Sequence, residues 1–243
     1  MKERPILFSA PMIRAILAGR KTQTRRIGKG AIIETLDFLG GIQTEPDAPG
    51  VLLSWGQLDD DDGKQGKPQW GAFCADYPEE GGVALGVGPG QVGDRLWVRE
   101  SFQALFADGI EDHYQANYKT GAGYKVYYMA TDERQEFVDA EDDLRDAVTP
   151  LIFMPRWASR ITLEITKVRI ERLQAITDND AIAEGVAQIV MESLPSIEQR
   201  GEYDALDVDA VSEYSTLWDR INGKRCPWEI NPWVWVIEFN RVA

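Results

Sequence analysis

Histidine and cysteine are scarce in this sequence, and their scarcity argues against several kinds of catalytic site. The 243 residues contain one histidine, His113, and two cysteines, Cys74 and Cys226. Two cysteines make no disulfide framework, and with a single histidine they argue against zinc, which normally takes at least three protein ligands. Most hydrolases that pair serine or cysteine with a histidine base are excluded unless His113 is that base. His113 lies among polar residues, so we interpret it as a surface side chain and predict no metal and no cofactor.

Basic residues are fewer than acidic ones, and long apolar runs are absent. The chain carries 26 Lys and Arg against 40 Asp and Glu, a formal net charge of −14. This excess argues against a sequence-independent grip on nucleic acid, although RNA stays open as a partner at a local basic pocket. No run approaches the roughly 18 apolar residues of a membrane span, and residues 1–10 lack the apolar core of a signal peptide. We therefore expect a cytoplasmic protein without a membrane partner; its oligomeric state is left open.

Charges of each sign are clustered along the chain. Acidic residues gather at 59–62, 79–80, 132–146 and 202–209. We interpret these runs as solvated loops and helix faces, with an acidic phage counter-defence protein that mimics nucleic acid as an alternative. Basic residues concentrate instead within residues 14–29, which is the first indication of a functional site.

Local signals predict an α+β fold made mostly of strands. Eight Trp, eight Tyr and eight Phe supply a sizeable core. Residues with helical spacing, caps and stop signals predict helices over 11–18, 177–184 and 209–222. Alternating apolar residues predict strands over 21–27, 95–100, 125–130, 161–173 (with a bulge) and 232–242.

The arrangement of these elements predicts one domain over residues 1–243. Widely spaced strands with helices in their connections favour a compact β-barrel with peripheral helices. Residues 28–92 are rich in Gly, Pro and Asp and show no clear period. We predict a large insertion there, or a lid over the pocket.

Residues 16–27 (ILAGRKTQTRRI) join a helix ending in Leu-x-Gly to Lys-Thr-x-Thr-x-Arg. This block resembles the signature of ASCH domains, a branch of the PUA-like β-barrels. Further pieces fit the resemblance: the Gly-Asp turn before RLWVRE, and the segments SRITLEIT, DAIAEGV and VWVIEF. The segments MPRWASR and NPWVWVIEF are similar to ASCH proteins of bacteriophages and prophages. The resemblance leaves residues 28–92 and much of 101–150 uncovered.

Some small bacterial ASCH proteins are amidohydrolases that remove the acyl group from N(4)-acetylcytidine. Matched residue by residue, the resemblance places their catalytic groups on Lys21, Thr24 and Glu184. It implies a metal-free amidohydrolase acting on a small modified nucleoside or nucleobase, and the negative net charge favours such a substrate over polymeric RNA. Most PUA-like domains only bind RNA or modified bases, so a binding module without turnover stays open. A ribonuclease is a further alternative.

The residue types agree with that chemistry on one geometric condition. Thr24 supplies a nucleophilic hydroxyl, Lys21 a base if burial lowers its pKa, and Glu184 a group that orients the lysine and relays its proton. In one regular strand Lys21 and Thr24 would point to opposite faces. We therefore predict that Lys21 lies in the turn after Gly19, before the strand begins. Glu184 ends its helix, where the dipole disfavours a carboxylate, and an exposed helix-end residue is the alternative interpretation.

Substrate contacts are predicted at Arg26, Trp97, Arg99 and Arg156. Arg26 shares a strand face with Thr24, where it would hold a carbonyl oxygen or phosphate, or else a structural ion pair. Trp97 and Arg99 share another face, with Trp97 as a base-stacking platform or as core. Arg156 is a further pocket candidate.

Overall fold

The computed structural model describes residues 1–28, 36, 51–56, 67–74, 82–107, 117–138, 144–186 and 209–242. Within these ranges the protein is mixed α+β, with many strands and few helices, as predicted. None of the helices in these ranges is long and apolar enough to span a membrane. His113, the acidic residues 59–62 and 79–80, and most of 202–209 lie outside the described residues.

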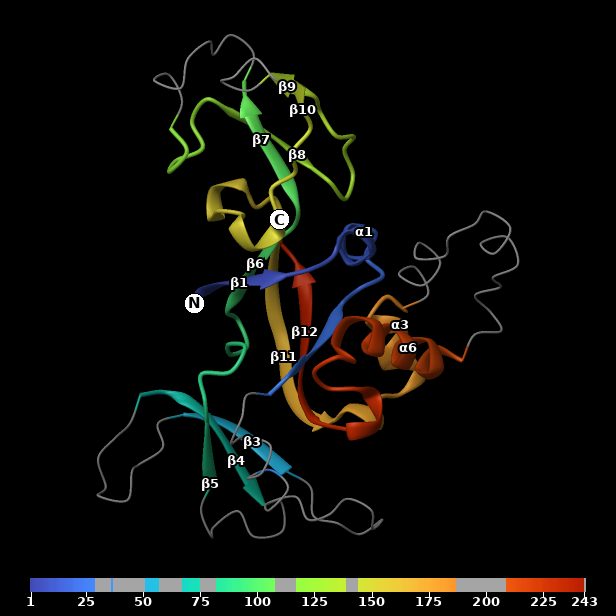
Figure 1. The fold of residues 1–243 in the computed structure, drawn as a ribbon. Helices are drawn as coiled ribbons and strands as arrows, with labels where there is room; N and C mark the ends of the chain where they lie inside the picture. The colour runs from blue at the N-terminus through green and yellow to red at the C-terminus, as the bar shows by residue number, and fades with distance from the viewer. Residues whose placement is uncertain are drawn as a thin grey trace.

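A central sheet of five strands organises the fold (Figure 1). The long strands β11 and β12 pair antiparallel at its centre, and β11 carries the predicted bulge, between Ile165 and Lys167. β6 pairs antiparallel with β11 and parallel with β1, whereas β2 pairs antiparallel with β12. In spatial order the strands are β1 (Glu3–Leu7), β6 (Arg95–Arg99), β11 (Thr162–Arg172), β12 (Trp233–Arg241) and β2 (Gln23–Ile27).

This sheet is open, so the predicted closed barrel is wrong for the described part of the chain. β1 and β2 are its two edges, and no ladder joins them there. Both edges instead line a cavity of about 640 Å³. One side chain bridges them, because Arg26 donates from Nη2 to the Leu7 carbonyl oxygen at 2.9 Å. Strand number and spacing predict a curved sheet, but they do not specify whether the last pair of edges closes.

The helices begin and end where their capping residues predict. α1 (Ala10–Leu17) follows Ser9 and has Pro11 in its first turn, and Gly19 lies just beyond its end with a φ of 72°. α3 (Asp178–Ala183) is capped by Thr177, whose hydroxyl oxygen accepts from the Asp180 N–H at 3.2 Å. α6 (Ala210–Asn222) is capped by the Asp209 carboxylate. These contacts satisfy backbone donors that have no partner inside the helix.

Alternate residues of β12 pack into cores on opposite faces of the sheet. Val234 and Val236 join the core beneath α3 and α6, which lie side by side in Figure 1. Ile237 and Phe239 join the core beneath α1. Trp233 and Trp235 are buried in a third cluster.

The remaining strands form small sheets at the two ends of the central sheet (Figure 1). A three-stranded sheet lies in the predicted insertion and packs through Trp70 and Leu85 against Trp233 and Trp235. Its strands are β3 (Val51–Gly56), β4 (Gln69–Cys74) and β5 (Gly82–Gly86). The other pairs are β7 (Phe102–Phe106) with β8 (Tyr124–Tyr128), and β9 (Phe137–Val138) with β10 (Leu144–Arg145). Short 3-10 helices span Leu151–Phe153, Arg156–Ala158, Leu173–Ala175 and Trp228–Ile230.

Candidate active site

Lys21 lies in the connection between α1 and β2, as its predicted pairing with Thr24 required. The turn at Gly19 ends α1, and β2 begins only at Gln23. The N–H of Lys21 donates to the Ala15 carbonyl at 3.1 Å, and the N–H of Thr22 donates to the Ala183 carbonyl at 2.9 Å. These bonds hold the connection against the end of α3, and Lys21 is only 2% exposed.

Glu184 ends α3 inside the protein rather than at its surface. It is 3% exposed, so the alternative of an exposed helix-end residue is wrong. Gly185 follows in the left-handed region, with a φ of 76°. A Cβ at this position would come within 3.1 Å of the Cβ atoms of Lys21 and Ala15. Glycine therefore allows the end of α3 to approach Lys21 closely.

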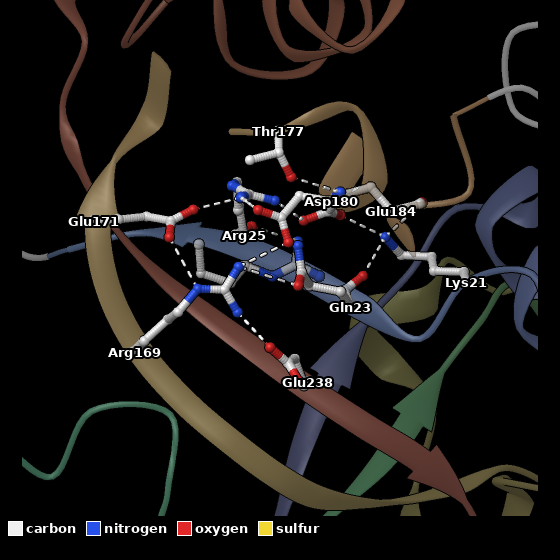
Figure 2. A network of polar contacts seen from close by, with 10 residues as sticks. Lys21, Gln23, Arg25, Arg169, Glu171, Thr177, Asp180, Glu184 and Glu238 are labelled. Carbon is white, nitrogen blue, oxygen red and sulfur yellow. Dashed lines mark hydrogen bonds and ion pairs between the residues drawn. The ribbon is translucent and has the colours of Figure 1, made fainter. Parts of the chain in front are cut away.

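Lys21 and Glu184 form a buried ion pair, at the right of Figure 2. Lys21 Nζ lies 2.7 Å from Glu184 Oε2 and also donates to the carbonyl oxygens of Glu184, at 2.9 Å, and Gln23, at 2.8 Å. Its three N–H bonds are thus all engaged. The helix dipole disfavours the Glu184 carboxylate at the C-terminus of α3 but favours a cation there. The charge of Lys21 therefore offsets the unfavourable position of Glu184.

A network of charged residues holds the other side of Glu184 (Figure 2). Arg25 donates to Glu184 Oε1 at 3.3 Å, to Asp180 Oδ2 at 3.1 Å and to Glu171. Arg169 donates to Asp180 Oδ1 at 2.8 Å, to Glu171 Oε2 at 2.9 Å and to Glu238. Sequence reasoning missed this network. Its only signal was the spacing of two between polar or charged residues in predicted strands, at 23 and 25 and at 169 and 171.

Burial shifts the pKa of two groups around Glu184. It lowers the pKa of Lys21, and the charge and hydrogen bond of Glu184 oppose that shift. Burial, together with the charge of Glu184, raises the pKa of the Tyr214 hydroxyl well above its usual value. Lys21 therefore loses its proton, and becomes able to accept one, at a lower pH than an exposed lysine does, and Tyr214 remains a neutral hydroxyl.

A cavity of about 460 Å³ lies at the free edge of β2. Thr24, in the middle of β2, lines it and is 1% exposed. Glu184 also lines the cavity, whereas Lys21 lies behind it. Among the described residues the Thr24 hydroxyl has no hydrogen-bond partner, so Thr24 is not bonded directly to Lys21. Aromatic walls come from Phe8, Tyr214 and Trp218.

Of the predicted substrate contacts, only Arg26 lines this cavity. It donates to the carbonyl oxygens of Leu7 and Arg25, and its guanidinium lies 5.1 Å from the Phe8 ring. The structure does not bring Trp97, Arg99 or Arg156 to the cavity.

These three side chains make other contacts. Trp97 is 8% exposed and packs under Arg99, whose guanidinium lies 4.6 Å from its ring. Arg156 pairs with Glu3 at 2.9 Å. Trp97 is therefore a core residue, the alternative to a base-stacking platform.

None of the described residues of the predicted insertion or lid lines the Thr24 cavity. Residues 85–89 line the neighbouring 640 Å³ cavity, between the two sheet edges. Over the ranges the structure describes, no cluster of three or more histidine, cysteine, aspartate or glutamate side chains is arranged to hold a metal ion.

The site is therefore an ion pair, a free hydroxyl and an aromatic cavity, assembled from segments far apart in the sequence. No family model, curated protein or solved structure matches this chain.

Proposed function

We propose that this protein is a PUA-like, ASCH-type amidohydrolase that removes the acyl group from a small modified nucleoside or nucleobase of the N(4)-acetylcytidine type. One observation carries the proposal. Lys21 and Glu184, 163 residues apart, meet at 2.7 Å beside the cavity that Thr24 lines. The resemblance selected these three residues from the sequence alone, and Thr24 and Glu184 line one cavity while Lys21 is paired with Glu184 behind it.

The cavity has the size and lining that a nucleoside requires. Its volume of about 460 Å³ falls in the range of roughly 300–1,000 Å³ typical of small-molecule sites. Phe8, Tyr214 and Trp218 supply flat apolar surface for a base. The Thr24 and Tyr214 hydroxyls have no partner among the described residues, so both are available to a polar ligand.

The edge position of β2 supplies a donor for the transition state. Along a strand, each residue directs its N–H and C=O to the same side, and the side alternates. The carbonyls of Gln23 and Arg25 accept from the side chains of Lys21 and Arg26, so they point away from β12. The Arg25 N–H therefore points to the free edge as well, next to Thr24, where it would stabilise a developing oxyanion.

The proposed reaction has two steps. Thr24 Oγ1 bonds to the amide carbon, and its proton passes to the Lys21–Glu184 pair. The carbon–nitrogen bond then breaks as the pair returns that proton to the leaving amine. In the second step water bonds to the same carbon, the ester bond to Thr24 breaks, and a proton from water restores the hydroxyl.

A binding module without turnover is the second candidate, and one observation favours it. The three N–H bonds of Lys21 are all directed at protein acceptors, an arrangement that also suits a purely structural ion pair. Such a module would use the same cavity and release no acyl group.

A turnover assay separates the two candidates. Purified protein is mixed with N(4)-acetylcytidine, with and without EDTA, and release of cytidine is measured by chromatography. We expect turnover insensitive to EDTA, falling by about a thousandfold or more in Thr24→Ala and Lys21→Met. Thr22→Ala is the matched control, because Thr22 is an exposed neighbour outside the Thr24 cavity. No turnover with any of several acyl groups, by protein that binds cytidine, would replace the enzyme with the binding module.

A further inference from the structure

Two arginines that line the Thr24 cavity form no ion pair with a carboxylate of the described residues. Within the described part of the chain, neither Arg26 nor Arg225 lies within ion-pair distance of a carboxylate. The cavity's third arginine, Arg25, is paired with three carboxylates. In a protein with a net charge of −14, unpaired arginines gathered at one cavity form a local positive site.

Arg225 lies at the mouth of the cavity, just after α6, with an exposed side chain. Asn222, at the end of α6, also lines the cavity. A helix C-terminus usually repels anions because its last carbonyls are free. Here the Asn222 carbonyl accepts from the N–H groups of Arg225 and Cys226, each at 2.8 Å, and the Asp219 carbonyl accepts from Gly223 at 2.8 Å. These bonds reduce the repulsion, and within the described part of the chain no contact occupies the exposed Arg225 guanidinium.

Arg26 supplies a second, deeper cation on the strand that carries Thr24. The two residues are separated by one position, so their side chains leave the same face of β2. A guanidinium has five N–H donors, and the described contacts of Arg26 are single bonds to the carbonyls of Leu7 and Arg25. Donors therefore remain for an oxygen in the cavity.

We propose that Arg225, with Arg26, forms a phosphate subsite, so that the substrate is an acylated nucleoside monophosphate rather than a neutral nucleoside. Guanidinium groups bind phosphate through paired, charge-assisted hydrogen bonds. The phosphate of a free nucleotide and the terminal phosphate of an RNA share this chemistry. The net charge of −14 favours the free nucleotide, because a polymer would bring many further phosphates to an acidic surface. That the substrate is acylated rests on the proposed function, whereas the phosphate subsite does not depend on it.

Calorimetry with ligands that carry no acyl group tests the subsite independently of turnover. Cytidine and cytidine 5′-monophosphate are titrated into wild-type protein, Arg225→Ala and Arg220→Ala. Arg220 is a matched control, since it is an exposed arginine of α6 outside the cavity. We expect the monophosphate to bind wild type at least about tenfold more tightly than cytidine, the order expected for a charge-assisted contact. Arg225→Ala should abolish that preference, and Arg220→Ala should keep it.

Several results would overturn the subsite. They are equal affinities for the two ligands, a preference that survives Arg225→Ala, and no binding of the monophosphate at all. Tighter binding of an oligocytidine with a steep salt dependence would assign the site to polymeric RNA instead. The two proposals also fail separately. Hydrolysis of N(4)-acetylcytidine without a phosphate preference removes only the subsite, and a phosphate preference without hydrolysis removes only the enzyme.

Discussion

Replacing Lys21 by methionine is the most direct perturbation of the site. Methionine keeps much of the aliphatic volume and removes the charge. It leaves the Glu184 carboxylate, 4% exposed, with only the longer contact from Arg25 at 3.3 Å. The carbonyl oxygens of Gln23 and Glu184 lose a donor as well. The stability of Lys21→Met therefore reports how strongly the ion pair is built into the fold.

The expected magnitude follows from the distance and the burial. At 2.7 Å, Coulomb's law with an effective dielectric constant of about 20 gives roughly 6 kcal/mol of attraction. Desolvation of both charges offsets several kcal/mol of this, whereas removing only one partner leaves a buried charge uncompensated. We expect Lys21→Met to lower the free energy of unfolding by about 3–5 kcal/mol. Lys21→Met combined with Glu184→Gln should cost about 2 kcal/mol less than the sum of the single changes.

Urea unfolding of the wild type, both single variants and the double variant measures this coupling energy. Arg156 and Glu3 provide a matched control, because their charged atoms are 2.9 Å apart but their side chains are 44% and 40% exposed. Their coupling should be much smaller and should fall as salt is raised, whereas that of Lys21 and Glu184 should hardly change. A Lys21–Glu184 coupling no larger than that of the exposed pair, or screened equally by salt, would refute the reasoning.

Three further predictions concern the elements around this pair. Gly19→Ala should lower the free energy of unfolding by about 1–2 kcal/mol through backbone strain alone, since no atom lies within 4 Å of the added methyl group. Gly185→Ala should cost more, because its methyl group also meets Lys21; equal losses in urea unfolding would contradict the close approach. Thr177→Ala should cost about 1 kcal/mol, and Thr177→Ser much less, in thermal unfolding, because the serine hydroxyl still caps α3. The pKa of Lys21 is lowered in the folded protein. Between that pKa and the usual lysine pKa, the unfolded chain therefore holds one more proton than the folded protein. Wild type should therefore gain stability over Lys21→Met as pH rises through that window, and a constant difference in urea unfolding would refute the shift.

Much of the secondary structure was predictable because its signals are local. A cap such as Thr177 or Asp209 acts on backbone groups within three residues, and strand alternation shows over a few positions. The position of Lys21 before β2 followed in the same way from Gly19. The closed barrel was not predictable, because closure depends on how two distant edges meet.

The candidate site was predicted only in part. The resemblance named Lys21, Thr24 and Glu184; Thr24 and Glu184 line one cavity, and Lys21 contacts Glu184 from behind it. It gave no indication of Arg225, because no motif connects the end of α6 with β2. Trp97 and Arg99 were placed correctly on a shared face, but alternation along a strand does not tell which cavity that face meets.

The sequence by itself determined where the helices begin and end, where the chain extends, and that Lys21 lies outside the strand that carries Thr24. These features depend on interactions between residues close in sequence. Only the tertiary structure decided that Glu184 is buried against Lys21, that Arg25 and Arg169 link β2, β11 and α3, and that an aromatic cavity opens at the edge of β2. These depend on contacts across as many as 163 residues, where burial and the matching of charges choose the partners.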